Sequence, residues 1–319
     1  MQGEWRAAAI LNESLADTLR FAAWYLAEGA SSLLLMFDNP QDPAIGVLST
    51  HPKIDCIGCT AAFWQDLGMA TDANFPKRQN AALTWAYGQT AEPWFLNVDA
   101  DEFLYVEGRS IGDLLAAQPE GVDAVRVVTA EVVTPVTPKS ALQFRLPMER
   151  PAAKRVYLGD APLFGPRRKG LVGHPQGKSA TRTGLAGVRV RQHWVEREDG
   201  SRVAEQEVDH AGRAFLLHMI GQDFDAWRRK LDWRSGSRGF TTPLTERIAA
   251  IMAGPDADAR LRELYDAMHK LDDAALARLE AEGARLELAL DLDAPARALF
   301  DADFAGAGRS TAAQSDLNA

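Results

Sequence analysis

The sequence predicts an α/β fold, in which a Rossmann-like, mostly parallel sheet is flanked by helices and followed by a C-terminal helical extension. Over the first 110 residues, short apolar runs typical of buried strands alternate with stretches in which apolar residues recur at helical spacing. Strands that alternate with helices form parallel sheets covered on both faces. Three of the four apolar runs also end in carboxylate or amide side chains, which in such sheets line the ligand crevice.

Each element of this first part has its own signal. The apolar run that ends at Asn12 predicts the first strand, and Gly29 stops the helix that follows it. The second run ends in a turn signature at residues 38–40, and Pro76 opens a later helix. The expected strands are residues 7–11, 33–37, 54–58 and 94–98, and the first expected helix is residues 15–26.

The rest of the chain has a different pattern. Residues 135–175 hold seven of the 16 prolines, so we expect an irregular, loop-rich segment there, with short strands at 123–133 and 187–194. From residue 223 we expect helices, the last marked by leucines between 276 and 290. The expected organisation is a catalytic domain over 1–240, a helical extension over 241–305 and a disordered tail over 306–319.

Composition excludes several classes of protein. The net charge of −9 argues against a nucleic-acid partner, because duplex binders carry a basic excess. The longest apolar run near the N-terminus is Leu33 to Phe37, far below the roughly 20 residues of a membrane helix. Two cysteines cannot form a disulfide framework. We therefore expect no transmembrane segment and a cytoplasmic protein, either free or peripheral at the inner membrane face.

Asp99-Ala100-Asp101 follows the fourth apolar run directly and is the sharpest chemical feature of the sequence. Two neighbouring carboxylates at a strand end would repel each other, and one would keep its proton. A divalent cation removes this conflict, and carboxylate oxygens suit Mg²⁺ or Mn²⁺, which commonly also hold substrate phosphates. Asp-x-Asp is, however, also a common tripeptide of turns and surfaces.

The segment from Trp94 to Leu104, WFLNVDADEFL, resembles the Asp-x-Asp-Glu-Phe segment of the family 2-like glycosyltransferases of GT-A fold. Other stretches resemble this family in the same order, over about residues 7–240. They are Ile10 to Glu13, Trp24 to Gly29, Leu33 to Asp42, Arg78 to Asn80, Gly177 to Ser179 with Arg182, His193, and the set His218, Phe224, Lys230 and Gly236. The family's serine in the Asp-Asn turn is replaced by Gln41.

The resemblance implies a donor of the nucleotide-diphosphate-sugar class, with a UDP-sugar favoured, and Mn²⁺ or Mg²⁺ as cofactor. It implies that Asp99 and Asp101 reach the donor through the metal and that His218 is a further metal ligand or a pyrophosphate contact. The other donor-binding residues that it implies are Asn12, Glu13, Asp38, Asn39, Arg78, Lys178, Arg182 and Lys230.

The expected reaction is transfer of the sugar to an acceptor hydroxyl, with inversion, in glycan or polysaccharide synthesis. The acceptor is expected to be a glycan or a lipid-linked molecule. Asp101 is the expected catalytic residue through the metal, and a base must take the acceptor proton. Glu102, Glu131 and Asp209 are candidates for that base, and Glu102 is the best placed of them.

Two other hypotheses about the function of the Asp-x-Asp segment remain open. A phosphatase of the haloacid dehalogenase kind would use Asp99 as its nucleophile, but Phe103 stands where such enzymes have threonine or valine. A non-catalytic GT-A-like domain would bind a sugar or nucleotide without transfer, because fold alone does not secure activity.

Overall fold

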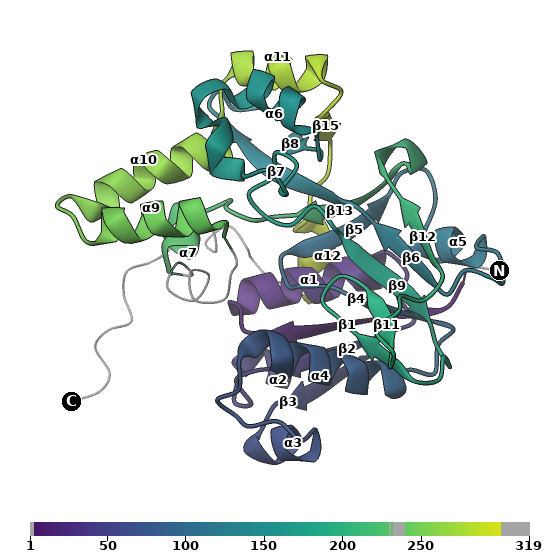
Figure 1. Cartoon of the computed structure of the whole chain (residues 1–319). Helices are drawn as coiled ribbons and strands as arrows, with labels where there is room; N and C mark the ends of the chain where they lie inside the picture. The colour runs from purple at the N-terminus through teal and green to yellow at the C-terminus, as the bar shows by residue number, and fades with distance from the viewer. Residues whose placement is uncertain (1–2, 230, 232–239, 301–319) are drawn as a thin grey trace, which may run out of the picture.

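The computed structural model describes residues 3–229, 231 and 240–300, and it shows an α/β protein built on two sheets (Figure 1). The larger, seven-stranded sheet has the strand order β12-β6-β9-β4-β1-β2-β3. Its strands are β1 (Trp5–Leu11), β2 (Ser32–Phe37), β3 (Ile54–Gly58), β4 (Trp94–Asn97), β6 (Ala124–Val127), β9 (Lys178–Arg182) and β12 (Glu205–Val208).

The four strands β3, β2, β1 and β4 are parallel and form the core half of this sheet. Every residue of β1 is buried, because helices or loops cover both faces. On the other side of β4, β9 runs antiparallel to both β4 and β6, and β12 pairs parallel with β6. The predicted fold class, a Rossmann-like sheet flanked by helices, is therefore confirmed.

The helices of the first half lie on both faces of this sheet (Figure 1). They are α1 (Leu15–Ala27), α2 (Pro43–Leu48), α3 (Ala61–Asp66), α4 (Phe75–Gly88) and α5 (Ile111–Ala116). The side chain of Ser14 caps α1 by accepting a hydrogen bond from the Asp17 N–H. Near its other end, the Tyr25 hydroxyl donates to the Glu102 carbonyl and accepts from the Leu104 N–H. These bonds fix α1 against the strand that follows Asp101.

The second sheet begins where the Asp-x-Asp turn ends. Its strand order is β15-β8-β7-β13-β5, with β14 added beside β7. The strands are β5 (Glu102–Val106), β7 (Thr129–Pro135), β8 (Leu142–Arg145), β13 (Ala214–His218), β14 (Lys270–Leu271) and β15 (Arg285–Leu288). Because β13 runs antiparallel to β5, His218 pairs with Glu102 and lies beside the turn.

The remaining elements follow β8 along the chain. A small two-stranded sheet of β10 (Val188–Val190) and β11 (Val195–Arg197) packs Val190 and Val195 into a hydrophobic cluster with residues of the larger sheet. The remaining helical elements are α6 (Arg150–Tyr157), η1 (Leu158–Phe164), η2 (His210–Gly212), α7 (Phe224–Arg229), α9 (Thr242–Met252), α10 (Ala257–His269), α11 (Asp273–Ala281) and α12 (Ala294–Phe300). No helix of the described residues has the length and apolar character that crossing a membrane requires.

The structure corrects two expectations about secondary structure. Residues 135–175 are not only loops, since they contain β8, α6 and η1. The last expected helix ends at Ala281, and Leu286 lies in β15, where it pairs with Phe144 of β8. The alternation of polar and apolar residues from Arg285 to Leu288 fits a sheet edge better than a helix. The expected tail over 306–319 lies outside the described residues.

A buried ion pair connects the second sheet to the C-terminal helices. The Arg145 guanidinium and the Glu131 carboxylate are fully buried and hydrogen-bonded, with Arg145 Nε 2.7 Å from Glu131 Oε1. Arg145 also donates to the Met268 carbonyl, while Glu131 accepts from the N–H groups of Val172 and Gly173. Burial alone would raise the pKa of Glu131, but Arg145 and these N–H donors outweigh it and lower that pKa.

We expect Arg145→Leu to lower the free energy of unfolding by about 3 kcal/mol or more, because Glu131 would stay buried without its counter-charge. Urea denaturation measures this change. The control is Arg155→Leu, which removes an exposed partner of Glu282 and should cost less than about 1 kcal/mol. Equal losses in the two variants would contradict the importance given to the buried pair.

Candidate functional site

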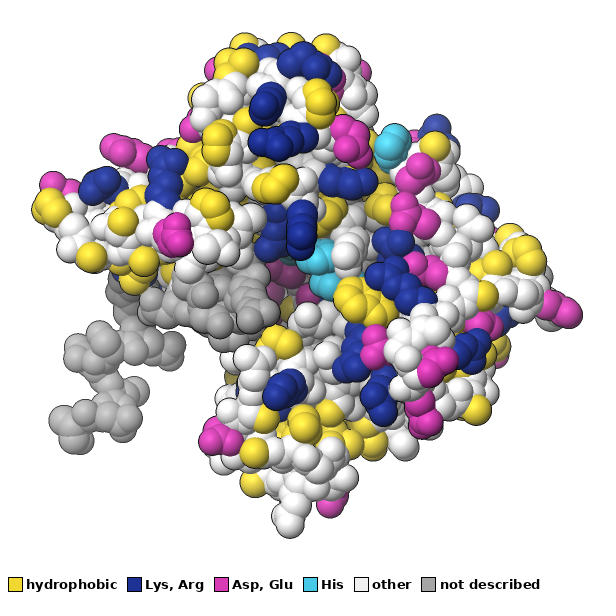
Figure 2. All heavy atoms as spheres, viewed as in Figure 1, with side chains coloured by type: hydrophobic (Ala, Val, Ile, Leu, Met, Phe, Trp, Pro, Cys, Tyr) yellow, Lys and Arg dark blue, Asp and Glu magenta, His cyan; other side chains and the backbone are white. Residues whose placement is uncertain are grey.

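The Asp99-Ala100-Asp101 turn lies at the carboxyl end of β4, at the same edge of the sheet as the ends of β1 and β2. Asn12 and Glu13 follow β1 there, and Asp38 follows β2. This is the edge at which parallel sheets bind ligands. Figure 2 shows a hollow in the middle of this face of the molecule, with histidine side chains in it and Lys and Arg side chains around it.

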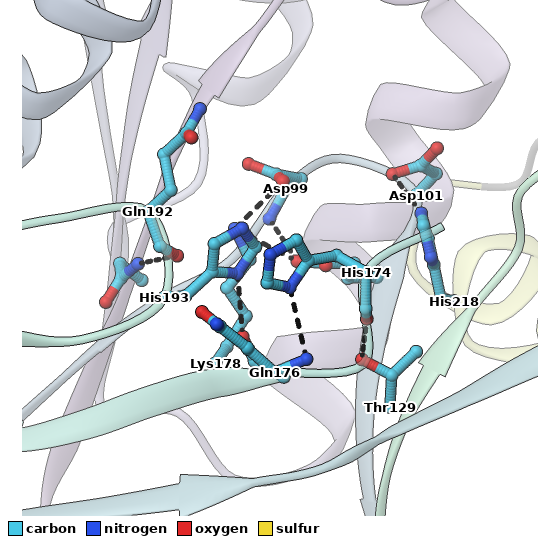
Figure 3. A network of polar contacts seen from close by, with 12 residues as sticks. Asp99, Asp101, Thr129, His174, Gln176, Lys178, Gln192, His193 and His218 are labelled. Atoms are coloured by element: carbon cyan, nitrogen blue, oxygen red, sulfur yellow. Dashed lines mark hydrogen bonds and ion pairs between the residues drawn. The ribbon is translucent and has the colours of Figure 1, made fainter. Parts of the chain in front are cut away.

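Lys178 places a buried positive charge directly under the turn (Figure 3). Its side chain is 1% exposed, and its Nζ lies 2.8 Å from Asp99 Oδ2 and 3.4 Å from Glu102 Oε2. The same Glu102 oxygen accepts a hydrogen bond of 2.9 Å from the Asp99 N–H. One ammonium therefore neutralises Asp99 and holds the first and last residues of the turn segment together.

A glycine brings Lys178 to this place. Gly177 has φ = +70°, and a Cβ atom there would lie 1.8 Å from the Val127 carbonyl oxygen. Only glycine tolerates both the left-handed backbone and this close approach to β6. The glycine of the Gly-Lys-Ser segment is therefore required by the way the chain enters β9.

Burial changes the protonation of this cluster. It raises the pKa of Glu102 to about 7, although the neighbouring Lys178 ammonium works in the opposite direction. Burial alone would lower the pKa of Lys178, but the carboxylates of Asp99 and Glu102 outweigh it and raise that pKa. Lys178 is thus charged at neutral pH, and burial brings the pKa of Glu102 close to neutral pH.

Gln79 holds the other oxygen of Asp99, and Gln192 holds Gln79. Gln79, on α4, donates from Nε2 to Asp99 Oδ1 at 2.8 Å, and Gln192 donates to the side-chain oxygen of Gln79. The Asn97 amide in turn donates to the Gln192 carbonyl at 3.2 Å. Both oxygens of Asp99 are therefore engaged within the protein, which fixes the side chain before any ligand arrives.

Asp101 and His218 form the second half of the site (Figure 3). His218 Nε2 lies 3.7 Å from Asp101 Oδ1, which is longer than a hydrogen bond but within reach of one shared ion. A carboxylate and an imidazole are suitable ligands for Mn²⁺, and a carboxylate suits Mg²⁺. The described residues contain no cluster of three or more carboxylate, imidazole or thiol side chains that could hold a metal ion.

The other residues expected at this edge are also present there. Asp38 accepts a hydrogen bond of 2.6 Å from Arg78, whose guanidinium lies 5.0 Å from the ring centroid of Trp64. The Asn39 side chain accepts from the Gln41 N–H and so closes the turn after β2. Asn12 is exposed at the end of β1, and Glu13 beside it is half-buried.

Arg182 is not brought to the site, which corrects its expected role in donor binding. It pairs with Trp94 at the start of β4, the opposite end of the strand from Asp99. Its guanidinium donates to the carbonyls of Val122 and Gln118 and lies 4.4 Å from the Trp94 ring centroid. These contacts are those of a structural residue. Lys230, also expected to bind the donor, lies outside the described residues.

The three candidates for the catalytic base lie in different parts of the fold. Glu102 is 4% exposed and lies beneath the turn, bonded to Lys178 and the Asp99 N–H. Glu131 is fully buried and paired with Arg145. Asp209 caps the short helix η2. Glu102 therefore has the contacts of a residue that positions the turn.

Sequence analysis missed His174, which stacks on His193 at a centroid distance of 3.9 Å beside Lys178. Burial lowers the pKa of His174 to about 4 and that of His193 to about 2, so both rings are neutral. His193 Nδ1 lies 2.9 Å from the Gly177 carbonyl, and His174 Nδ1 accepts from the Gln176 N–H. Gln192 was missed as well, since its contact with Gln79 spans 113 residues.

Comparison with known proteins gives no close relative. No protein-family model and no curated protein matches the chain. It is similar to HddC from Yersinia pseudotuberculosis (11% identity, 43% of this chain and 66% of HddC covered, TM-score 0.28). It is also similar to a mycobacterial protein (12%, 65% and 65%, 0.34) and to Mycobacterium tuberculosis glucosyl-3-phosphoglycerate synthase in complex with phosphoglyceric acid (14%, 74% and 76%, 0.36). Similarity this low carries no argument about activity.

We expect the stability provided by Glu102 to fall as the pH rises. Its pKa is about 7 in the folded protein against an ordinary value of 4.5, so this contribution is complete below about 4.5 and is lost as the pH rises through 7. Between pH 5 and pH 8, the free energy of unfolding of the wild type should fall by about 1–3 kcal/mol relative to Glu102→Gln. Urea denaturation of both proteins at the two pH values measures the difference, and parallel pH profiles would contradict it.

Proposed function

We propose that this protein is a metal-dependent glycosyltransferase. It would move a sugar from a nucleotide-diphosphate donor, with a UDP-sugar favoured, to an acceptor hydroxyl with inversion, in glycan or polysaccharide synthesis. The observation that carries the proposal is the Asp99-Ala100-Asp101 turn at the carboxyl edge of the parallel sheet, with His218 3.7 Å from Asp101. The resemblance of the surrounding sequence to the Asp-x-Asp-Glu-Phe segment supports it.

The nucleotide half of the donor would lie along the ends of β1 and β2. Asn12, Glu13, Asp38 and Asn39 offer oxygen atoms there that can accept hydrogen bonds from ribose hydroxyls and from a base. Arg78 would act on the donor through Asp38, which it holds with a hydrogen bond of 2.6 Å. The donor would then extend from this edge toward the turn after β4.

The diphosphate would meet the Asp101 side of the turn. Lys178 neutralises Asp99, so that the turn repels an anionic ligand less than two free carboxylates would. Asp101 and His218 are the residues that would hold Mn²⁺ or Mg²⁺. When bound, such a cation stabilises the negative charge that develops on the leaving diphosphate. Asp99 is fixed by Lys178 and Gln79. It would face the ribose or the metal-bound phosphates from the side of the site opposite to His218.

Glu102 would position this arrangement and would not take the acceptor proton. Its carboxyl group lies below the turn and accepts a hydrogen bond from the Asp99 N–H, and its side chain is 6% exposed. A group that removes a proton from an acceptor hydroxyl must reach that hydroxyl within hydrogen-bond distance. The acceptor would be a glycan or a lipid-linked molecule that approaches from the open side of the hollow.

We expect the protein to bind UDP more tightly with Mn²⁺ than without it. Isothermal titration with UDP, with and without the metal, measures this difference. Asp101→Ala should abolish the gain from Mn²⁺ and the transfer activity, because it removes a proposed metal ligand on the surface of the turn. The far-UV circular dichroism spectrum should stay unchanged, since Asp101 lies in a turn between two strands.

Other outcomes of the same titration would point to the alternative functions. Turnover of p-nitrophenyl phosphate without UDP binding would overturn the proposal in favour of a phosphatase with Asp99 as nucleophile. Tight UDP binding without hydrolysis or transfer of any UDP-sugar would indicate a non-catalytic binding domain. A panel of UDP- and GDP-sugars would identify the donor.

We expect Lys178→Ala to weaken UDP binding by about tenfold, because Asp99 would then present an unneutralised charge to the diphosphate. The matched control is Arg182→Ala, which removes a cation from the other end of the same strand, β9. Its UDP affinity should equal that of the wild type. Thermal melting checks that both variants are folded, and equal losses of affinity would contradict the placement of the two residues.

A further inference from the structure

A cavity of about 600 Å³ lies away from the Asp-x-Asp turn, between α6, η1 and the loop over residues 165–170. Three basic side chains, those of Arg150, Lys154 and Lys169, line it together with apolar ones that include Leu158 and Phe164. Among the residues that the structure describes, none that lines the cavity is acidic, although the whole chain carries a net charge of −9. Figure 2 shows Lys and Arg side chains interleaved with hydrophobic ones on the lobe that contains α6.

Of the three basic residues of α6, Arg150 and Lys154 line the cavity, and the position of Arg150 in particular is unfavourable for a positive charge without an anion nearby. Arg150 and Lys154 are one helical turn apart, and like charges at this spacing destabilise a helix. Arg150 is also the first residue of α6, where the helix dipole disfavours a positive charge. Within the described part of the chain, neither side chain has an ion-pair partner, and Lys169 has only a 3.5 Å contact with the exposed Glu149.

The backbone around the cavity is strained. Among the described residues, four that are not glycine have a positive φ, and two of these, Leu158 (φ = 53°) and Lys169 (φ = 51°), line this cavity. Leu158 is in addition 61% exposed. Such backbone strain persists only where the surrounding structure imposes it, and it is concentrated at ligand-binding sites. The strain holds an apolar side chain and a basic one at the same opening.

The floor of the cavity is rigid. The Phe164 ring is buried and stacks on Tyr157 with a centroid distance of 3.9 Å. The Tyr157 hydroxyl donates to the Gly170 carbonyl at 2.7 Å, which ties the 165–170 loop to the end of α6. The Arg145 guanidinium lies 5.0 Å from the centroid of the Phe164 ring. A preformed cavity with an apolar floor and a few charged groups is typical of a small-molecule site.

We propose that this cavity binds the phosphate group of a small amphiphilic phosphate ester. Arg150, Lys154 and Lys169 would hold the phosphate oxygens through charge-assisted hydrogen bonds. Leu158 and Phe164 would contact the apolar part of the same molecule. The proposal does not depend on the glycosyltransferase activity, because it uses none of the residues at the Asp-x-Asp turn.

Isothermal titration with octyl phosphate, below its micelle concentration, tests the proposal. Inorganic phosphate and the neutral octyl tetraethylene glycol ether serve as partial ligands, and both should bind more weakly. Lys154→Ala should weaken octyl phosphate binding by about tenfold. The control is Arg155→Ala, which removes the next cation along α6, one that pairs with Glu282 and does not line the cavity. Equal binding by both variants, or no preference for octyl phosphate over the neutral ether, would overturn the proposal.

The variant Leu158→Gly tests the apolar contact with the ligand without destabilising the fold. Glycine adopts positive φ freely, so this variant should unfold at a temperature no lower than the wild type. Its affinity for octyl phosphate should fall about three- to tenfold, while that for inorganic phosphate stays unchanged. A variant that keeps the full affinity for octyl phosphate would contradict the proposed contact.

A second experiment distinguishes two sources of the phosphate ester, a membrane lipid and a soluble molecule. Vesicles of phosphatidylcholine with phosphatidylglycerol test a lipid headgroup by co-sedimentation. If wild-type protein sediments with them and Lys154→Ala does not, the ligand is a membrane lipid. If octyl phosphate binds and the vesicles do not, the ligand is a soluble ester. Failure of both probes would overturn the site.

Discussion

A single buried ammonium group holds the candidate site together. Lys178 is almost completely removed from solvent, and it can be so only because Asp99 and Glu102 surround its charge. The same contact fixes the turn between β4 and β5, on which the orientation of Asp101 depends. The left-handed backbone of Gly177 brings Lys178 to this position. The position of the charge, and with it the geometry of the site, therefore depends on the backbone conformation at Gly177.

The turn also joins the two sheets. Asp99 follows β4 of the larger sheet and is held by Lys178 of β9, a strand of that same sheet. Asp101 precedes β5 of the second sheet and lies beside His218 of the neighbouring strand β13. The two acidic residues therefore face different partners, an internal ammonium on one side and an imidazole on the other. This division reduces the repulsion between two carboxylates that lie one residue apart.

The clearest sequence signal for a strand is a continuously apolar run. The strands β1, β2 and β4 lie inside the sheet, and hydrophobic residues from Ala7 to Leu11 and from Leu33 to Phe37 mark two of them without interruption. Strands such as β9, with the sequence KSATR, carry no such signal although most of their residues are buried. Their polar side chains are buried because they find partners in distant segments, and local sequence does not contain that information.

The sequence by itself determined the class of the fold and the position of the Asp-x-Asp turn at a strand end, because both depend on local pattern. Lys178 and His218 were singled out only by the resemblance to a family. Only the tertiary structure decided which side chains contact one another. It placed Arg182 against Trp94 at the far end of β4, paired Asp99 with Lys178, and brought Gln192 to Gln79. Side-chain partners 79 to 113 residues apart are set by strand order and register, and these follow from packing the whole chain.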